Sequence, residues 1–156
     1  MASTGIQRTI NVPGLAQARE QYELALSDIS ADLGWAALHC GRLLHLSGDL
    51  LGADQAFRAS IIAADPEHAP LAACHLGRLS EQLGDSEGAA AAYLQAMASG
   101  HPKHAAAAAY RLGGLLQAKG DMTAARAAFE QAAESKNPWY ARLSEDALAA
   151  FDEPAA

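Results

Sequence analysis

A thiol, an imidazole and a guanidinium stand close together in the sequence, at Cys74, His75 and Arg78. A second imidazole and thiol are adjacent, at His39 and Cys40. Cysteine thiolates and imidazoles bind zinc, and they also act as nucleophile and base in catalysis. These residues could therefore form a metal or thiol-dependent site, provided that the fold brings the two pairs together.

The spacing of these residues does not favour such a site. The sequence contains no Cys-x2-Cys pair, and Tyr110 and Arg111 stand 36 residues after Cys74 and His75. It also lacks a glycine-rich phosphate loop and a Gly-x-Ser-x-Gly nucleophile elbow. We therefore expect no catalytic residue, no metal and no cofactor, and we predict that the protein is not an enzyme. A metal- or thiol-dependent enzyme that uses His39, Cys74 and His75 is kept as a third alternative.

The composition favours helices packed on helices. Of the 156 residues 51% are hydrophobic but only 6% are aromatic, so most apolar side chains are small. Ala, Leu, Gln and Glu are abundant, and they are good helix formers and poor strand formers. The net charge of −7 argues against nucleic acid or an anionic membrane as the partner. Two cysteines and the lack of a long apolar stretch predict a cytoplasmic protein with free thiols.

Three segments of the chain align without a gap, and they begin 36 residues apart at His39, His75 and Arg111. A period of this size is typical of a solenoid. The residues that the segments share are Gly41, Gly77 and Gly113; Gly48, Gly84 and Gly120; Asp49, Asp85 and Asp121; Ala53, Ala89 and Ala125; Phe57, Tyr93 and Phe129; and Pro66, Pro102 and Pro138.

Each segment has the pattern of a helix, a tight turn and a second helix. The Gly of each Gly-Asp pair can end a first helix in the left-handed conformation, and the Asp can cap the second helix. The Pro suits the first turn of the helix that follows. The pattern predicts first helices near 35–46, 70–82 and 105–118, and second helices near 50–63, 86–98 and 122–134.

These units resemble tetratricopeptide repeats, whose signature has Leu-Gly in the first helix, Ala-x3-Phe in the second helix and then Pro. Leu76-Gly77 and Leu112-Gly113 match the signature, and Ala-x3-Phe or Ala-x3-Tyr occurs in all three units. Alanine stands at three positions where the family has Trp, and the period is 36 residues instead of 34. The resemblance implies an all-α protein with the right-handed α-α superhelix of a solenoid.

We predict one domain, residues 13–151, between an N-terminal arm and a short C-terminal tail. Ala18 and Tyr22 repeat the Ala-x3-Tyr pattern, which indicates that the first cap helix is a degenerate second helix. The predicted parts are the arm 1–12, the N-terminal cap helix 13–33, the units 34–67, 70–103 and 106–138, the C-terminal cap helix 138–151 and the tail 152–156.

In tetratricopeptide repeat proteins the first helices line a concave groove that binds a segment of another protein. Helical spacing on the first helices then predicts which side chains face that groove. The predicted groove residues are Trp35, Leu38, His39, Arg42, His45, Leu71, Cys74, His75, Arg78, Glu81, Tyr110, Arg111 and Gln117. We expect Trp35, Leu38, Leu71 and Tyr110 to be its apolar anchors.

Charge is distributed unevenly along these helices. Of the 18 acidic residues only Glu81 lies in a predicted first helix, whereas Arg42, Arg78 and Arg111 all do. Guanidinium groups bind carboxylates in a bidentate fork. We therefore expect a non-catalytic adaptor that binds an acidic or C-terminal peptide segment of a partner protein. The alternative is a homo-oligomeric scaffold that uses the cap surfaces or fills the groove with residues 1–12.

Overall fold

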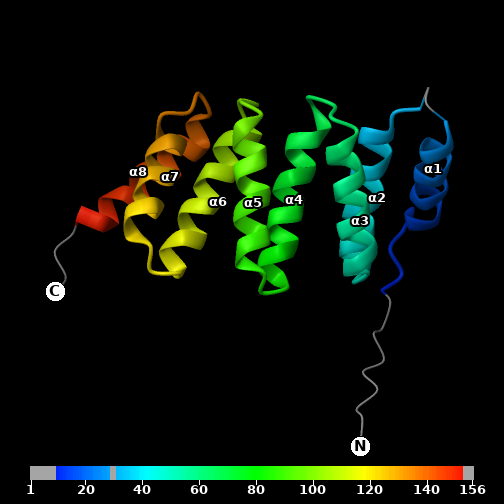
Figure 1. Cartoon of the computed structure of the whole chain (residues 1–156), viewed down its shortest axis with the longest axis horizontal. Helices are drawn as coiled ribbons and strands as arrows, with labels where there is room; N and C mark the ends of the chain where they lie inside the picture. Colours follow the sequence, from blue (N-terminus) through cyan, green and yellow to red (C-terminus); the bar gives the residue numbers. More distant parts are fainter. Residues whose placement is uncertain (1–9, 29–30, 153–156) are drawn as a thin grey trace, which may run out of the picture.

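The structure is a computed structural model that describes residues 10–28 and 31–152. It contains helices and no strand within those ranges, and Figure 1 shows the helices side by side in chain order along one row. The helices are α1 (Leu15–Ser27), α2 (Leu33–Ser47), α3 (Leu50–Ile62), α4 (His68–Gln82), α5 (Ser86–Ala98), α6 (His104–Ala118), α7 (Met122–Ala133) and α8 (Pro138–Asp152).

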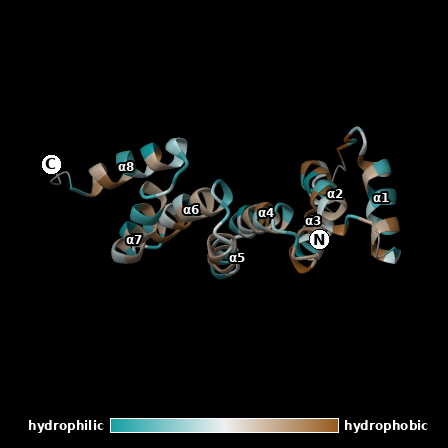
Figure 2. Cartoon of the chain, turned by 90° about the horizontal axis from the view of Figure 1, so that it is seen from above, coloured by the Kyte–Doolittle hydropathy of each residue, from teal (hydrophilic) through white to brown (hydrophobic). Residues whose placement is uncertain are grey.

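The helices form two layers. Seen from above in Figure 2, α2, α4, α6 and α8 lie in one layer, and α3, α5 and α7 lie in the other. Each helix of the first layer approaches the next one in that layer closely, whereas no such approach joins α3 to α5 or α5 to α7 in the described part of the chain. The first layer is therefore the inner side of a curved stack, as the prediction of an all-α solenoid requires.

The six predicted repeat helices agree with the structure to within two residues at each end. The turns explain this agreement, because Gly48, Gly84 and Gly120 all have positive φ angles, of 86°, 78° and 83°. The aspartate that follows each glycine caps the second helix. Asp49 and Asp85, for example, accept the N–H groups of Gly52 and Gly88 at 2.9 Å.

One predicted boundary and the predicted role of two prolines were wrong. The N-terminal cap helix does not reach residue 33, because α1 ends at Ser27 and Asp32 caps the start of α2 by accepting the N–H of Trp35 at 2.9 Å. Pro66 and Pro102 lie two residues before α4 and α6 instead of inside them, whereas Pro138 begins α8.

The residue before each of these prolines caps the helix that follows. Asp65 accepts the N–H of His68 at 2.8 Å, and Asn137 accepts the N–H of Trp139 at 3.1 Å. In the unit between them His101 has this role, because its Nδ1 accepts the N–H groups of Lys103 and His104 at 3.3 Å. The sequence reading did not include these caps, although Asp-Pro, His-Pro and Asn-Pro occupy equivalent positions.

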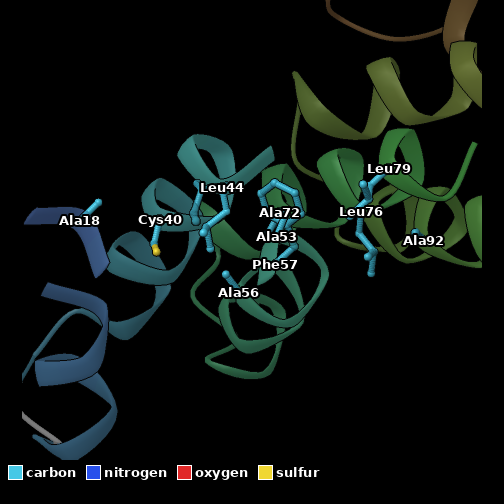
Figure 3. Close-up of a cluster of buried hydrophobic side chains, with 11 residues drawn as sticks. Ala18, Cys40, Leu44, Ala53, Ala56, Phe57, Ala72, Leu76, Leu79 and Ala92 are labelled. Carbon is cyan, nitrogen blue, oxygen red and sulfur yellow. The ribbon is translucent and has the colours of Figure 1, made fainter. Parts of the chain in front are cut away.

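An aromatic ring packs on a glycine in each repeat unit. Phe57, Tyr93 and Phe129 are buried, and each lies against the glycine of its own first helix. Figure 3 shows the cluster around Phe57, in which small side chains such as Ala53, Ala56 and Ala72 surround the ring. The alanine-rich composition therefore allows the helices to pack closely.

The adjacent glycines Gly113 and Gly114 of α6 test this packing. A Cβ atom at Gly113 would lie 2.7 Å from the ring of Phe129, whereas one at Gly114 meets nothing within 4 Å. We expect Gly113→Ala to lower the free energy of unfolding by about 1–3 kcal/mol. The matched control Gly114→Ala should raise it by about 0.5–1 kcal/mol, because alanine restricts the unfolded chain. Urea unfolding followed by circular dichroism measures both, and equal stability of the two variants would contradict the packing argument.

Candidate functional site

A pair of adjoining hollows opens on the layer of first helices, and the two hollows share His75 and Arg78. The α4–α6 hollow has a volume of about 180 Å³, and its lining residues are Leu71, Cys74, His75, Arg78, Lys103, His104, Ala107, Arg111 and Tyr140. The α2–α4 hollow has a volume of about 470 Å³, and its lining residues are Arg42, His45, Leu46, His75, Arg78 and Gln82. None of the described side chains that line these hollows is a carboxylate.

The structure brings the predicted arginines together at these hollows. Arg42 lines the α2–α4 hollow, Arg111 lines the α4–α6 hollow, and Arg78 lines both. Leu71 and Cys74 also line the α4–α6 hollow, and His45 lines the α2–α4 hollow. Since every lining residue comes from α2, α4, α6, α8 or the turn before α6, the hollows lie on the inner layer.

Leu38 and Tyr110 line neither of the two hollows. Leu38 is only 5% exposed and belongs to the same buried cluster as Ala72 of α4, so a ligand cannot reach it. Tyr110 packs between Phe129 and Tyr140, with ring centroids 5.7 and 6.1 Å apart, and it lines neither hollow. The anchor assignment of Leu38 was therefore wrong, because a neighbouring helix covers it. Tyr110 is half-buried and stays a predicted contact outside the two hollows.

The remaining predicted groove residues lie outside the two hollows. Trp35 is 43% exposed and its ring stacks on His39 at a centroid distance of 5.2 Å. Gln117 lines a separate hollow with Arg126 and Phe151. A ligand that fills both basic hollows would have to extend further along α2 to reach Trp35.

Glu81 is held by the neighbouring second helix. The hydroxyl of the buried Tyr93 donates a hydrogen bond to Glu81 Oε1. Burial, and then this hydrogen bond, raise the pKa of Tyr93 above its usual range. Glu81 therefore interacts with α5, and it forms no ion pair with Arg78, which lies on the same helix.

The arginines at the hollows differ from other arginines of the chain. Arg58 pairs with Asp54 at 2.8 Å, and Arg126 pairs with Asp152 at 2.7 Å. Arg42, Arg78 and Arg111 are exposed, and they form no ion pair or hydrogen bond with any part of residues 10–28 and 31–152. Their positive charges are therefore available to an anionic ligand.

Burial makes the Cys74 thiol unreactive. Its Sγ donates a hydrogen bond to the backbone carbonyl of His104 at 3.4 Å. Burial raises the pKa of Cys74 to about 11, although Arg111 and Arg78 act in the opposite direction. In the described ranges no three His, Cys, Asp or Glu side chains are grouped so that they could hold a metal ion.

His75 is neutral at neutral pH. Its ring stacks on Phe57 with the centroids 5.3 Å apart. Burial, and then the positive charges of Arg78 and Arg42, lower the pKa of His75 to about 4. The imidazole therefore contributes a polar wall to both hollows without adding charge.

Sequence reasoning missed several lining residues, among them Leu46, Lys103, His104 and Tyr140. Tyr140 follows His104 by 36 residues, so the repeat period could have indicated that α8 occupies the place of a further first helix. The structure confirms that place, because α8 contacts α6 as α6 contacts α4.

The tetratricopeptide repeat family matches residues 72–99 and 106–137, which contain the pairs α4–α5 and α6–α7. These two helix pairs match tetratricopeptide repeats. A solved structure with a similar fold is the crystal structure of MamA, with a TM-score of 0.61 and 20% sequence identity. The similarity covers 76% of this chain and 66% of the MamA chain, just under two thirds of it. No match was found among curated proteins.

Proteins built from such repeats are typically protein–protein interaction adaptors, and the family is typically non-catalytic. Within the described ranges, no helix has both the length and the apolar character needed to cross a membrane.

The lowered pKa of His75 predicts how the free energy of unfolding depends on pH. A histidine in an unfolded chain titrates near pH 6.5, whereas His75 titrates near 4 in the folded protein. Its stabilising effect is therefore complete above about pH 6.5 and is lost as the pH falls toward 4. After allowance for solvent screening of this incompletely buried ring, the loss between pH 7 and 5 should be about 1 kcal/mol.

Two variants isolate the contribution of His75. His75→Phe keeps an aromatic ring on Phe57 and cannot be protonated, and His75→Gln loses both the ring and the titration. Thermal unfolding at pH 7 and 5 should show a smaller loss of stability in both variants than in the wild type. The same loss in all three proteins would show that His75 does not cause it.

Proposed function

We propose that this protein is an adaptor that binds an acidic segment of a partner protein along its inner layer. The observation that carries the proposal is the set of arginines Arg42, Arg78 and Arg111 at two joined hollows without a lining carboxylate. Guanidinium groups that have no partner inside the protein can each bind a carboxylate in a bidentate fork. An extended segment that crosses α2, α4 and α6 could contact all three.

The charge of the rest of the chain supports an acidic ligand. The net charge is −7, yet the linings of the two hollows contain only neutral and basic side chains. Opposite potentials steer a ligand to its site and repel ligands of the wrong sign. The inner layer should therefore attract acidic segments, while the acidic surface elsewhere keeps them from binding at random.

Apolar contacts at the hollows would add affinity. Leu46 is 65% exposed at the α2–α4 hollow, and Leu71 and Tyr140 line the α4–α6 hollow. Together with Trp35 they replace the anchor expected at Leu38. Such contacts position a peptide and exclude water around the charged pairs.

The arginines can be tested with a charge-matched control. The variant Arg42→Gln, Arg78→Gln, Arg111→Gln removes the guanidiniums of the hollows. The control Arg58→Gln, Arg126→Gln, Arg142→Gln removes the same charge elsewhere. Calorimetry should show that the first variant binds an acidic peptide at least about tenfold more weakly than the wild type, since charge-assisted hydrogen bonds are lost. The control should lose less than about threefold, the size of a long-range charge effect.

The chemistry of the peptide gives the second arm of this test. A peptide whose Asp and Glu are replaced by Asn and Gln should bind weakly, and a C-terminal amide separates the contribution of a terminal carboxylate from that of acidic side chains. Equal affinity for the acidic and the neutral peptide, or equal binding by both arginine variants, would contradict the proposal.

A homo-oligomeric scaffold remains the alternative outcome. Residues 1–9 of the predicted arm and residues 153–156 of the tail lie outside the described residues, and Ile10 donates its N–H to the Ser47 carbonyl at 3.3 Å, near the end of α2. Light scattering over a range of concentrations distinguishes the two functions, because a strict monomer is incompatible with the scaffold.

A cytoplasmic location is also part of the proposal, and the free thiols Cys40 and Cys74 support it.

A further inference from the structure

The α4–α6 hollow concentrates more positive charge than the rest of the inner layer. Arg78, Arg111 and Lys103 all line it, and its volume of about 180 Å³ is less than half that of the α2–α4 hollow. No partner for the Lys103 ammonium is found in residues 10–28 and 31–152, as for the two arginines. A small space that is lined by three cationic side chains favours an anion of more than one charge over a single carboxylate.

The two arginines of this hollow lie on neighbouring helices that contact each other. Arg78 of α4 and Arg111 of α6 both line the hollow beside Cys74, and the positive charge of each opposes the rise in the pKa of the thiol. The hydrogen bond from Cys74 to the His104 carbonyl joins α4 to α6 beside the hollow. The packing of α4 on α6 holds the backbone of both arginines in place, which reduces the ordering cost of binding.

A carboxylate does not match this set of charges. It carries one negative charge, so it would leave an excess of positive charge in a partly enclosed space next to Leu71 and Ala107. A phosphorylated side chain carries a charge of about −1.5 to −2 at pH 7 and three strong acceptor oxygens. Two guanidinium forks, one ammonium and the Tyr140 hydroxyl provide enough donors for all three oxygens.

We propose that the α4–α6 hollow binds a phosphoserine or phosphothreonine of the partner's acidic segment. This inference rests on the proposed function, because it specifies one residue of the ligand for the same groove. The α2–α4 hollow, with Arg42 and His45, then binds acidic side chains on one flank of the phosphorylated residue.

Peptide libraries test the proposal without a known partner. Three libraries share a degenerate acidic sequence and differ only at a fixed centre, which is phosphoserine, glutamate or serine. We expect the phosphoserine library to bind at least about tenfold more tightly than the glutamate library, as the doubled charge and the extra acceptor predict. Equal or tighter binding of the glutamate library overturns this inference and leaves the proposed function intact.

Point variants locate the phosphate subsite. Arg111 and Lys103 line only the α4–α6 hollow, so Arg111→Gln and Lys103→Gln should each reduce the preference for phosphoserine over glutamate to less than about threefold. Arg42 lines only the α2–α4 hollow, so the matched control Arg42→Gln should lower the affinity for both libraries and keep the preference. Thermal unfolding of each variant verifies that the fold is retained, which is expected for exposed side chains. A preference that survives both Arg111→Gln and Lys103→Gln overturns the assignment to this hollow.

The remaining outcomes separate the two proposals. If none of the three libraries binds, both the proposed function and this inference fail. If inorganic phosphate displaces the phosphoserine library at the concentration at which free phosphoserine does, and the flanking acidic residues make no difference, the hollow is a site for small phosphates and the inference also fails. Support requires that the phosphorylated segment binds more tightly than inorganic phosphate.

Discussion

The contact between an aromatic ring and a glycine sets the distance between the helices of each repeat unit. A Cβ atom on Gly41, Gly77 or Gly113 would lie 2.5–2.8 Å from ring atoms of Phe57, Tyr93 or Phe129, so only glycine permits this approach. The residue after Gly41 and Gly77 is an arginine, which is turned by about 100° around the helix and faces the inner layer. The same contact that packs each unit therefore also orients the charged side chains of the groove.

Several acidic side chains serve structural roles outside the two hollows, whose linings contain only neutral and basic side chains. Asp49, Asp85 and Asp121 cap the second helices, and Glu81 accepts a hydrogen bond from Tyr93. Like charges that gather on one face without partners oppose folding. The stability of the packed units offsets this cost, and natural proteins commonly accept such local conflicts at binding sites.

Burial changes the chemistry of the residues that look most reactive in the sequence. It raises the pKa of Cys74 to about 11 and lowers that of His75 to about 4, so both side chains are neutral at physiological pH. A protonated thiol is a poor nucleophile and a poor metal ligand, and an imidazole with a pKa of about 4 is a weak general base. They form the walls of the hollows, and the permanent charges of Arg78 and Arg111 supply the means of recognition.

The helices, the turns and the repeat can be predicted from the sequence, because each depends on local signals. A glycine that takes a positive φ and an aspartate that caps three residues onward act over a single turn of chain. Which residues of the inner stripe a ligand can reach depends instead on how the units pack. Helical spacing gives the direction of Leu38, but packing against a neighbouring helix buries it. The α4–α6 hollow likewise needs Tyr140 from a helix that lies far along the chain, because a concave site is made only when successive units stack.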